Sequence, residues 1–151
     1  MPKKTAREKL HKKCDLPKIK PAPEKWGGGS MLIAHPTEFD ALMRAVPKGK
    51  VITVVQLREA LAIRHNADMC CPLTAGIFVN IAAAASEEDR LDGREEITPY
   101  WRTLKKDGEL NPKYPGGLTQ HKALLEAEGH TVIQRRKRLF LADFNSNLHL
   151  L

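Results

Sequence analysis

The sequence predicts a mainly α-helical domain of the winged helix-turn-helix type, with a small β-hairpin at its C-terminal end. Three stretches between residues 36 and 88 place apolar residues at helical spacing, and short turns or linkers separate them. Two β-prone runs then close the chain on either side of four consecutive basic residues. Three short helices followed by a hairpin are the element order of a winged helix-turn-helix.

Residues 1–30 are expected to form a basic, flexible N-terminal arm, followed by a folded domain over residues 31–151. Residues 1–25 contain nine Lys or Arg and three Asp or Glu, so they carry +6 of the chain's net charge of +7. Prolines alternate with the lysines, and Gly27–Ser30 has the composition of a flexible joint. Such an arm either attracts polyanions through counterion release or only keeps the protein soluble.

Composition argues against several classes of protein. The 151 residues suffice for one domain with a core and an appendage. No apolar run reaches the roughly 20 residues of a membrane span, and the N-terminus lacks an apolar secretory leader. The three cysteines, Cys14, Cys70 and Cys71, fit a reducing compartment, and no zinc-binding pattern accompanies them. We therefore expect a cytoplasmic monomer that binds neither membrane, metal nor cofactor.

The first two helices are expected from residue 36 or 37 to about residue 46, and over residues 54–64. A turn over residues 47–50 and a short β-like run over residues 51–53 separate them. Thr53 is a suitable N-cap for the second helix because its hydroxyl can accept a hydrogen bond from the first turn.

A linker over residues 65–71 leads to the third expected helix, from Pro72 to about Glu88. Proline is favoured in a first helical turn, and the helix that follows is unusually apolar. The connection over residues 87–96 contains six acidic and two basic residues, so we expect it to face solvent.

The stretch from Ile97 to Gly129 is where we expect the protein to bind its ligand. It opens with an aromatic turn over residues 99–102 and continues through a polar turn over residues 106–108. The loop over residues 114–117 contains a glycine pair, which lets the backbone approach another molecule closely. A helix with apolar residues at helical spacing follows, and Gly129 is a suitable C-cap for it.

The β-hairpin is expected from two β-prone runs, residues 131–134 and 139–142. Between them lie Arg135, Arg136, Lys137 and Arg138, which would form a basic tip.

Four motifs then occur in one order along the chain. They are VPKGKVITVVQL from Val46, PYWR from Pro99, YPGGL from Tyr114 and LLEAEG from Leu124. Together they resemble the DNA-binding domain of the alkylguanine-DNA alkyltransferases, the methylated-DNA–protein-cysteine methyltransferases. The hairpin makes the chain most similar to the non-catalytic, alkyltransferase-like branch. The resemblance implies a helix-turn-helix that enters the minor groove, flips a damaged guanine and places it against a Pro-Cys-His-Arg turn.

Within this resemblance, the alkyl-accepting cysteine corresponds to Tyr100 and the activating histidine to Trp101. A phenol cannot take an alkyl group as a thiolate does, so the family's transfer reaction is expected to be lost at this turn. The proline and arginine of the motif remain as Pro99 and Arg102. The carboxylate that orients the family's histidine remains as Glu128, without that partner.

The family's DNA-gripping residues are carried over only in part. The base-flipping tyrosine corresponds to Val54 and the intercalating arginine to a position near Thr74, and no Lys or Arg occurs between His65 and Asp89. The resemblance implies a lesion pocket of Pro99, Tyr100, Trp101, Arg102, Tyr114, Pro115, Gly116 and Glu128. The expected DNA-contacting residues are Val54, Thr74, Asn80, Lys105, Lys106, Lys113, Arg135, Arg136, Lys137 and Arg138.

Several of these residues allow two interpretations. Tyr100 and Trp101 either offer a surface on which a base stacks or fill the vacated pocket as core. Arg102 either pins its turn by bonding to carbonyl groups or contacts phosphate. Cys70 and Cys71 precede a helix N-terminus, whose dipole lowers a thiol pKa, but buried cysteines are most often small hydrophobes.

The leading hypothesis is a non-enzymatic DNA-binding protein that recognises alkylated guanine for DNA repair. Its expected partners are double-stranded DNA and other repair proteins. One alternative is an enzyme, a methylated-DNA cysteine alkyltransferase that acts through Cys70 or Cys71. Another is a protein-interaction module, suggested by the apolar third helix and the acidic connection over residues 87–96.

Overall fold

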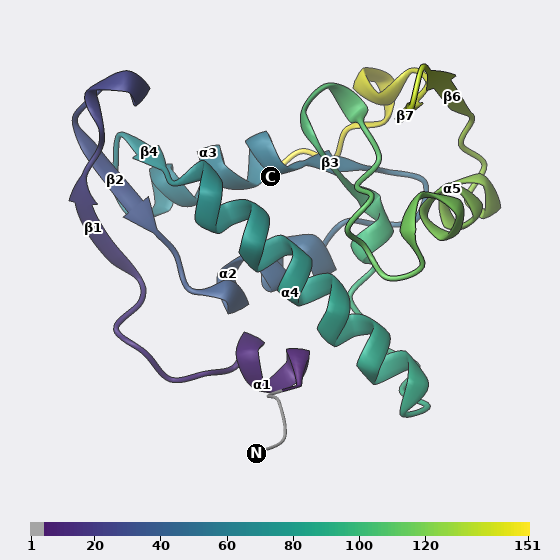
Figure 1. Cartoon of the computed structure of the whole chain (residues 1–151), viewed down its shortest axis with the longest axis horizontal. Helices are drawn as coiled ribbons and strands as arrows, with labels where there is room; N and C mark the ends of the chain where they lie inside the picture. The colour runs from purple at the N-terminus through teal and green to yellow at the C-terminus, as the bar shows by residue number, and fades with distance from the viewer. Residues whose placement is uncertain (1–4) are drawn as a thin grey trace.

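The computed structural model describes residues 5–151, which form a mixed α/β fold with five α-helices and three small sheets (Figure 1). The mainly α expectation is therefore corrected, whereas the C-terminal hairpin is confirmed. The helices are α1 (Ala6–Leu10), α2 (Pro36–Arg44), α3 (Val54–Arg64), α4 (Pro72–Leu91) and α5 (Gly117–Ala127). The strands are β1 (Lys18–Pro21), β2 (Ser30–Ile33), β3 (Ile52–Thr53), β4 (Met69–Cys70), β5 (Thr103–Leu104), β6 (Val132–Arg135) and β7 (Arg138–Leu141).

Helix α4 crosses the broad face of the molecule diagonally, and α1, α2 and α3 pack against it (Figure 1). Its buried side is made of small residues, among them Ala75, Val79, Ala82 and Ala83, so neighbouring helices can approach closely. The opposite side leaves Leu73 67% and Ile77 56% exposed. Much of the apolar surface of α4 is thus used within the chain, which weakens the interpretation of this helix as a protein-binding module.

Helices α2 and α3 begin at the predicted positions, and the predicted cap Thr53 is confirmed. His35 caps α2 and Thr53 caps α3, and in each case the residue three positions later bonds back to the cap backbone. The predicted bounds of α3 are confirmed, and α2 ends at Arg44, two residues before the expected end. Helix α4 runs on to Leu91, so part of the acidic connection is helical.

The N-terminal residues that the structure describes do not form the flexible arm that we expected. Helix α1 lies against the C-terminal half of α4, where the backbone N–H groups of Ala6 and Arg7 donate to the Glu88 carboxylate at 2.7 and 3.0 Å. The Arg7 guanidinium pairs with Asp89 at 2.6 Å and with Asp92 at 2.7 Å. The acidic connection is therefore partly an intramolecular docking site for the basic N-terminal segment.

Strand β1 also belongs to the folded body. It pairs antiparallel with β2, in a register that runs from Lys18 opposite Ile33 to Pro21 opposite Ser30. Strand β2 also pairs in parallel with β4. Strand β4 lies within residues 65–71, which were expected to form a linker. Lysine and proline are unfavourable strand residues, so the local sequence predicted no strand, and long-range pairing with the apolar β2 overrides that preference.

The apolar interior divides into two clusters that share Trp101 at their margins. The larger cluster lies among α2, α3, α4 and the N-terminal sheet. The smaller one lies beneath the hairpin and contains Val51, Leu104, Leu110, Leu125 and Leu141. The parallel pair of β3 and β5 brings the chain before α3 beside the chain after the aromatic turn. The aromatic turn therefore sits where the two halves of the domain meet.

None of the helices in residues 5–151 combines the length and the apolar content that crossing a lipid bilayer requires.

His121 links α5 to the loop that carries the aromatic turn. Its ring is buried, with Nδ1 accepting from the Asn111 N–H at 3.1 Å and Nε2 donating to the Trp101 carbonyl at 2.8 Å. This arrangement needs the neutral ring. Burial lowers the pKa of His121 to about 4, although its two backbone partners act in the opposite direction.

We predict that His121 makes the protein less stable as the pH falls from 6.5 toward 4. In that interval the unfolded chain takes up a proton on this ring and the folded chain does not, so protons favour unfolding. The contribution is about 3 kcal/mol over the interval. Urea unfolding at several pH values, for wild type and His121→Gln, measures it. Parallel pH profiles for the two proteins would contradict the assignment.

Candidate nucleic-acid interface

The residue before the aromatic turn, Thr98, is anchored to two helices by buried polar groups. The Thr98 hydroxyl donates to Asp40 Oδ1 of α2 at 2.6 Å, and the Ser86 hydroxyl of α4 donates to the Thr98 carbonyl at 2.6 Å. Pro99 follows as a buried residue, and Tyr100–Arg102 form a single 3₁₀ turn. The bonds to Thr98 therefore fix the start of the turn independently of the side chains of the turn itself.

Tyr100 and Tyr114 fill the space in which the resemblance places the alkyl pocket. Tyr100 is 1% exposed and Tyr114 is 3% exposed, and their rings meet edge to face with centroids 5.3 Å apart. The Tyr114 hydroxyl donates to the Thr103 carbonyl at 2.9 Å. Neither ring offers a face on which a base can stack, so the structure places both side chains in the core.

Burial also makes both phenols weak acids. Burial, reinforced by the nearby Glu87 carboxylate, raises the pKa of Tyr100 to about 12. Burial raises the pKa of Tyr114 as well. Both side chains are therefore neutral near pH 7 and are poor nucleophiles.

Glu128 is bound by two residues of the aromatic turn. It accepts from Trp101 Nε1 at 3.0 Å, from Arg102 Nε at 2.9 Å and from Arg102 Nη2 at 2.7 Å. Arg102 Nη1 also donates to the Val46 carbonyl at 2.8 Å. Glu128, which lacks the family's histidine, thus has other partners, and Arg102 pins the turn to the end of α5 and to the chain after α2.

The Arg102–Glu128 pair is largely shielded from water. The side chain of Arg102 is 14% exposed and that of Glu128 is 8% exposed. Burial alone would raise the pKa of Glu128, but the hydrogen bonds from Arg102 and Trp101 outweigh it and lower that pKa. The carboxylate is therefore ionised and fully engaged in holding the turn.

The loop before α5 requires glycine for reasons internal to the chain. Gly116 has φ +81°, and a Cβ built there would lie 2.4 Å from Cβ of Gln120. Gly117 has φ +69°, but a Cβ there would meet nothing within 4 Å. Pro115, between Tyr114 and this pair, is half-buried. At Gly117 the space that a side chain would occupy is empty, so another molecule can approach the backbone closely there.

The expected DNA-contacting residues on the helices lie near the starts of α3 and α4 and about two turns further along α4. Val54 begins α3 and packs against the larger apolar cluster. Thr74 lies in the first turn of α4, with its hydroxyl 3.5 Å from the Cys71 carbonyl. Asn80 accepts from the Asn111 side chain at 2.9 Å. All three are half-buried, and what α4 exposes nearby is apolar, namely Leu73 and Ile77.

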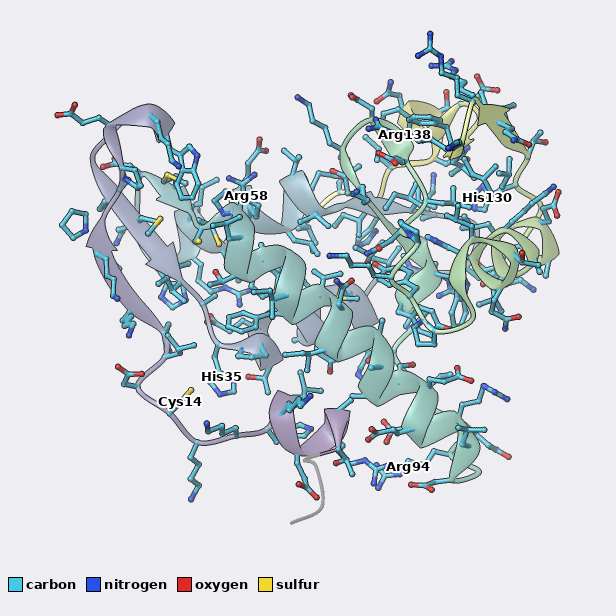
Figure 2. The ribbon with its side chains drawn as sticks, viewed as in Figure 1. Cys14, His35, Arg58, Arg94, His130 and Arg138 are labelled. Atoms are coloured by element: carbon cyan, nitrogen blue, oxygen red, sulfur yellow. The ribbon has the colours of Figure 1, made fainter. Side chains whose placement is uncertain are left out.

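The expected basic contacts are exposed in two groups. Lys105, Lys106 and Lys113 lie on the loops between β5 and α5. Arg135, Arg136, Lys137 and Arg138 form the tip of the β6–β7 hairpin, where Arg135 opposes Arg138. Figure 2 labels Arg138 at this end of the molecule. The hairpin therefore presents four cations that the surrounding fold leaves open to solvent.

The two adjacent cysteines differ in their environment. Burial raises the pKa of Cys70 to about 11. Cys71 is the N-cap residue of α4, and burial raises its pKa too. The donor groups near the thiol, namely the Thr74 hydroxyl and the backbone N–H groups of Thr74 and Leu73, outweigh burial and lower the pKa overall. Of the two, Cys71 is the better candidate for a thiolate, although it too is buried.

Residues 5–151 contain no group of three or more His, Cys, Asp or Glu placed to hold a metal ion.

Removing the Glu128 carboxylate tests the role of this cluster. We expect Glu128→Ala to lower the free energy of unfolding by about 3–5 kcal/mol, because the largely buried Arg102 would lose its counter-ion. The matched control is Glu126→Ala on the exposed side of α5, for which we expect less than about 0.5 kcal/mol. Urea unfolding followed by tryptophan fluorescence measures both. Equal effects of the two substitutions would show that the cluster does not stabilise the fold.

Comparison with known proteins supports the fold inferred from the four motifs. No protein-family model matches the chain, and no curated protein matches its sequence. Among solved structures, S. pombe Atl1, crystallised in complex with damaged DNA containing O6-carboxymethylguanine, matches with a TM-score of 0.55 at 17% sequence identity. The match covers 77% of this chain and 94% of that chain. The resemblance is thus confirmed at the level of structure, and this chain has the fold of the alkyltransferase-like protein Atl1.

Proposed function

We propose that this protein binds duplex DNA, recognises alkylated guanine for DNA repair and transfers no alkyl group. The proposed DNA-binding unit is the Atl1-like part of the chain, within residues 31–151. The observation that carries the proposal is a structure similar to that of Atl1, a protein crystallised with damaged DNA. The motif resemblance supports it by aligning Tyr100 with the family's acceptor cysteine. Repair proteins that act on the marked lesion are the further partners that this function requires.

The absence of transfer chemistry follows from the side chain at position 100. Alkyl transfer to the protein needs a thiolate or an equally strong nucleophile. Tyr100 has a pKa of about 12 and is buried by Trp101 and Tyr114. Glu128 is ionised but bound to Arg102 and Trp101, so it is not free to act as a general base.

Binding must depend on cations outside α4, the second helix of the proposed helix-turn-helix. The exposed side of α4 is apolar near its N-terminus, and it lacks the basic groups that usually contact phosphate. The basic hairpin tip and the exposed lysines on the loops between β5 and α5 supply such cations. Such a grip is mainly electrostatic, so affinity falls steeply as salt rises.

Reversing charge at the hairpin tip tests this grip. We expect Arg136→Glu with Lys137→Glu to weaken duplex binding about tenfold at moderate salt and to reduce the log–log salt slope by about 2. The control is Lys48→Glu with Lys50→Glu, which makes the same charge change on the exposed turn after α2. Fluorescence anisotropy at four salt concentrations measures both. Equal losses in the two double variants would remove the hairpin from the proposed interface.

Lesion recognition is tested with two fluorescent duplexes that differ only in one methylated guanine. We expect the lesion duplex to bind at least about threefold tighter, because a weakened base pair costs less to open. Because Tyr100 and Tyr114 close the pocket, the extruded base must displace Tyr100 or rest outside it. Equal, salt-sensitive affinity for the two duplexes would refute the lesion part of the proposal and leave DNA binding standing.

A second candidate function is alkyl transfer to Cys71, which the lowered pKa of this N-cap thiol favours. Mass spectrometry after incubation with a methylguanine duplex detects it as about 14 Da added to the peptide that contains Cys71. We expect no adduct, because the thiol is buried and residues 65–89 contain no Lys or Arg to grip the flipped strand. An adduct that Cys71→Ser abolishes would replace the non-enzymatic proposal.

A further inference from the structure

A groove of about 570 Å³ lies between the N-terminal segment and α4, away from the aromatic turn. Its floor is apolar and consists of Leu16, Ile33, Pro36, Phe78 and Ile81. Four lysines line it as well, Lys9, Lys12, Lys18 and Lys20. Asp15 is the one acidic residue among those lining it, and it pairs with Lys18 at 3.2 Å. The groove thus combines an apolar floor with a strongly basic rim.

The fold builds this groove from distant parts of the chain. Lys18 and Ile33 are direct partners in the β1–β2 ladder, so their side chains lie on the same face of the sheet. Thr74, Phe78 and Ile81 follow helical spacing on the side of α4 that lines the groove. The segment between α1 and β1 forms the outer wall.

The outer wall is anchored at two points. His35 Nε2 lies 2.9 Å from the Lys12 carbonyl, and the Glu88 carboxylate holds the start of α1. Figure 2 labels Cys14 on this wall and His35 at the start of α2. The wall therefore has a defined position, and the groove is a preformed feature of the described chain.

We propose that this groove binds an acidic peptide segment of a partner protein, with a bulky apolar side chain on the floor and carboxylates on the lysine rim. The floor argues against a bare nucleic-acid backbone, because phosphates would leave the apolar residues uncovered. The rim argues against a single-headed amphiphile, because one carboxylate head group carries a single negative charge and cannot neutralise four lysines. An acidic peptide supplies both the several charges and the apolar group.

This proposal goes beyond DNA binding and does not depend on it. The groove lies on the N-terminal side of the molecule, whereas the basic hairpin tip lies at the other end (Figure 1). A partner in the groove and DNA on the hairpin would therefore use different cations. Thr74 lines the groove and is also an expected DNA contact, so competition between the two ligands must be measured.

The experiment titrates full-length protein onto a fluorescein-labelled peptide in which glutamates flank a central Phe-Leu pair. We expect binding in the micromolar range, weakened about tenfold by Lys12→Glu with Lys20→Glu. The control is Lys48→Glu with Lys50→Glu, the same charge change outside the groove, which should leave peptide affinity unchanged. A peptide with alanine in place of Phe-Leu should bind at least about tenfold more weakly, because the floor then loses its contact.

Chemical blocking provides a second test that leaves the sequence unchanged. Cys14 is exposed and lines the groove, whereas Cys70 and Cys71 are buried. Alkylation of Cys14 with a benzyl maleimide should abolish peptide binding, and Cys14→Ser treated in the same way should retain it. Circular dichroism of each protein checks that the fold is intact.

Four outcomes would overturn the proposal. The first two are an equal loss of peptide affinity in the lysine-pair variant and its control, and no effect of replacing Phe-Leu in the peptide. The third is binding of dodecanoate, a single-headed amphiphile, without binding of the peptide. The fourth is displacement of the bound peptide by an equimolar amount of duplex DNA. The hairpin variant Arg136→Glu with Lys137→Glu separates the two functions. It should lose DNA affinity and keep peptide affinity, so failure of the groove and failure of DNA binding are distinguishable.

Discussion

The bidentate ion pair between Arg102 and Glu128 is the contact on which the arrangement of the two apolar clusters depends. Arg102 belongs to the aromatic turn, Glu128 lies at the end of α5, and the Val46 carbonyl belongs to the chain after α2. Trp101, which borders both clusters, donates to the same carboxylate. A charge pair this shielded from water is stable only because every partner is satisfied. The turn is consequently rigid, and its geometry is that of a structural joint.

The same cluster places a buried aromatic side chain, Tyr100, where the motif resemblance suggests a reactive residue. The motifs suggest a cysteine and a histidine where this chain has Tyr100 and Trp101. The larger side chains occupy the space, and Tyr100 packs against Trp101 and Tyr114. The carboxylate remains useful because it now accepts from an indole N–H and a guanidinium. Aromatic residues at this turn are thus compatible with the Atl1-like fold, because Tyr100 packs in the core.

The N-terminal segment changes the character of the surface around α4. Arg7 is held against the acidic end of α4, and Lys18 and Lys20 lie in the first sheet. This placement turns a diffuse positive charge into a lysine rim with a defined position over an apolar floor. The basic hairpin tip and the proposed peptide groove are accordingly separate surfaces, whereas Thr74 of α4 belongs both to the groove and to the expected DNA contacts.

The sequence alone determined the features that depend on neighbours along the chain. Capping residues and apolar spacing placed α2, α3 and α5, the alternating runs placed the hairpin, and the side chain at position 100 excluded thiolate chemistry there. Only the tertiary structure decided what depends on residues far apart in sequence. Strand β1 exists because β2 pairs with it, Glu128 has partners because α5 ends beside the aromatic turn, and the burial of Tyr100 follows from its neighbours. Local propensity carries no information about such long-range contacts, so the core role of Tyr100 and the groove beside α4 became visible only in three dimensions.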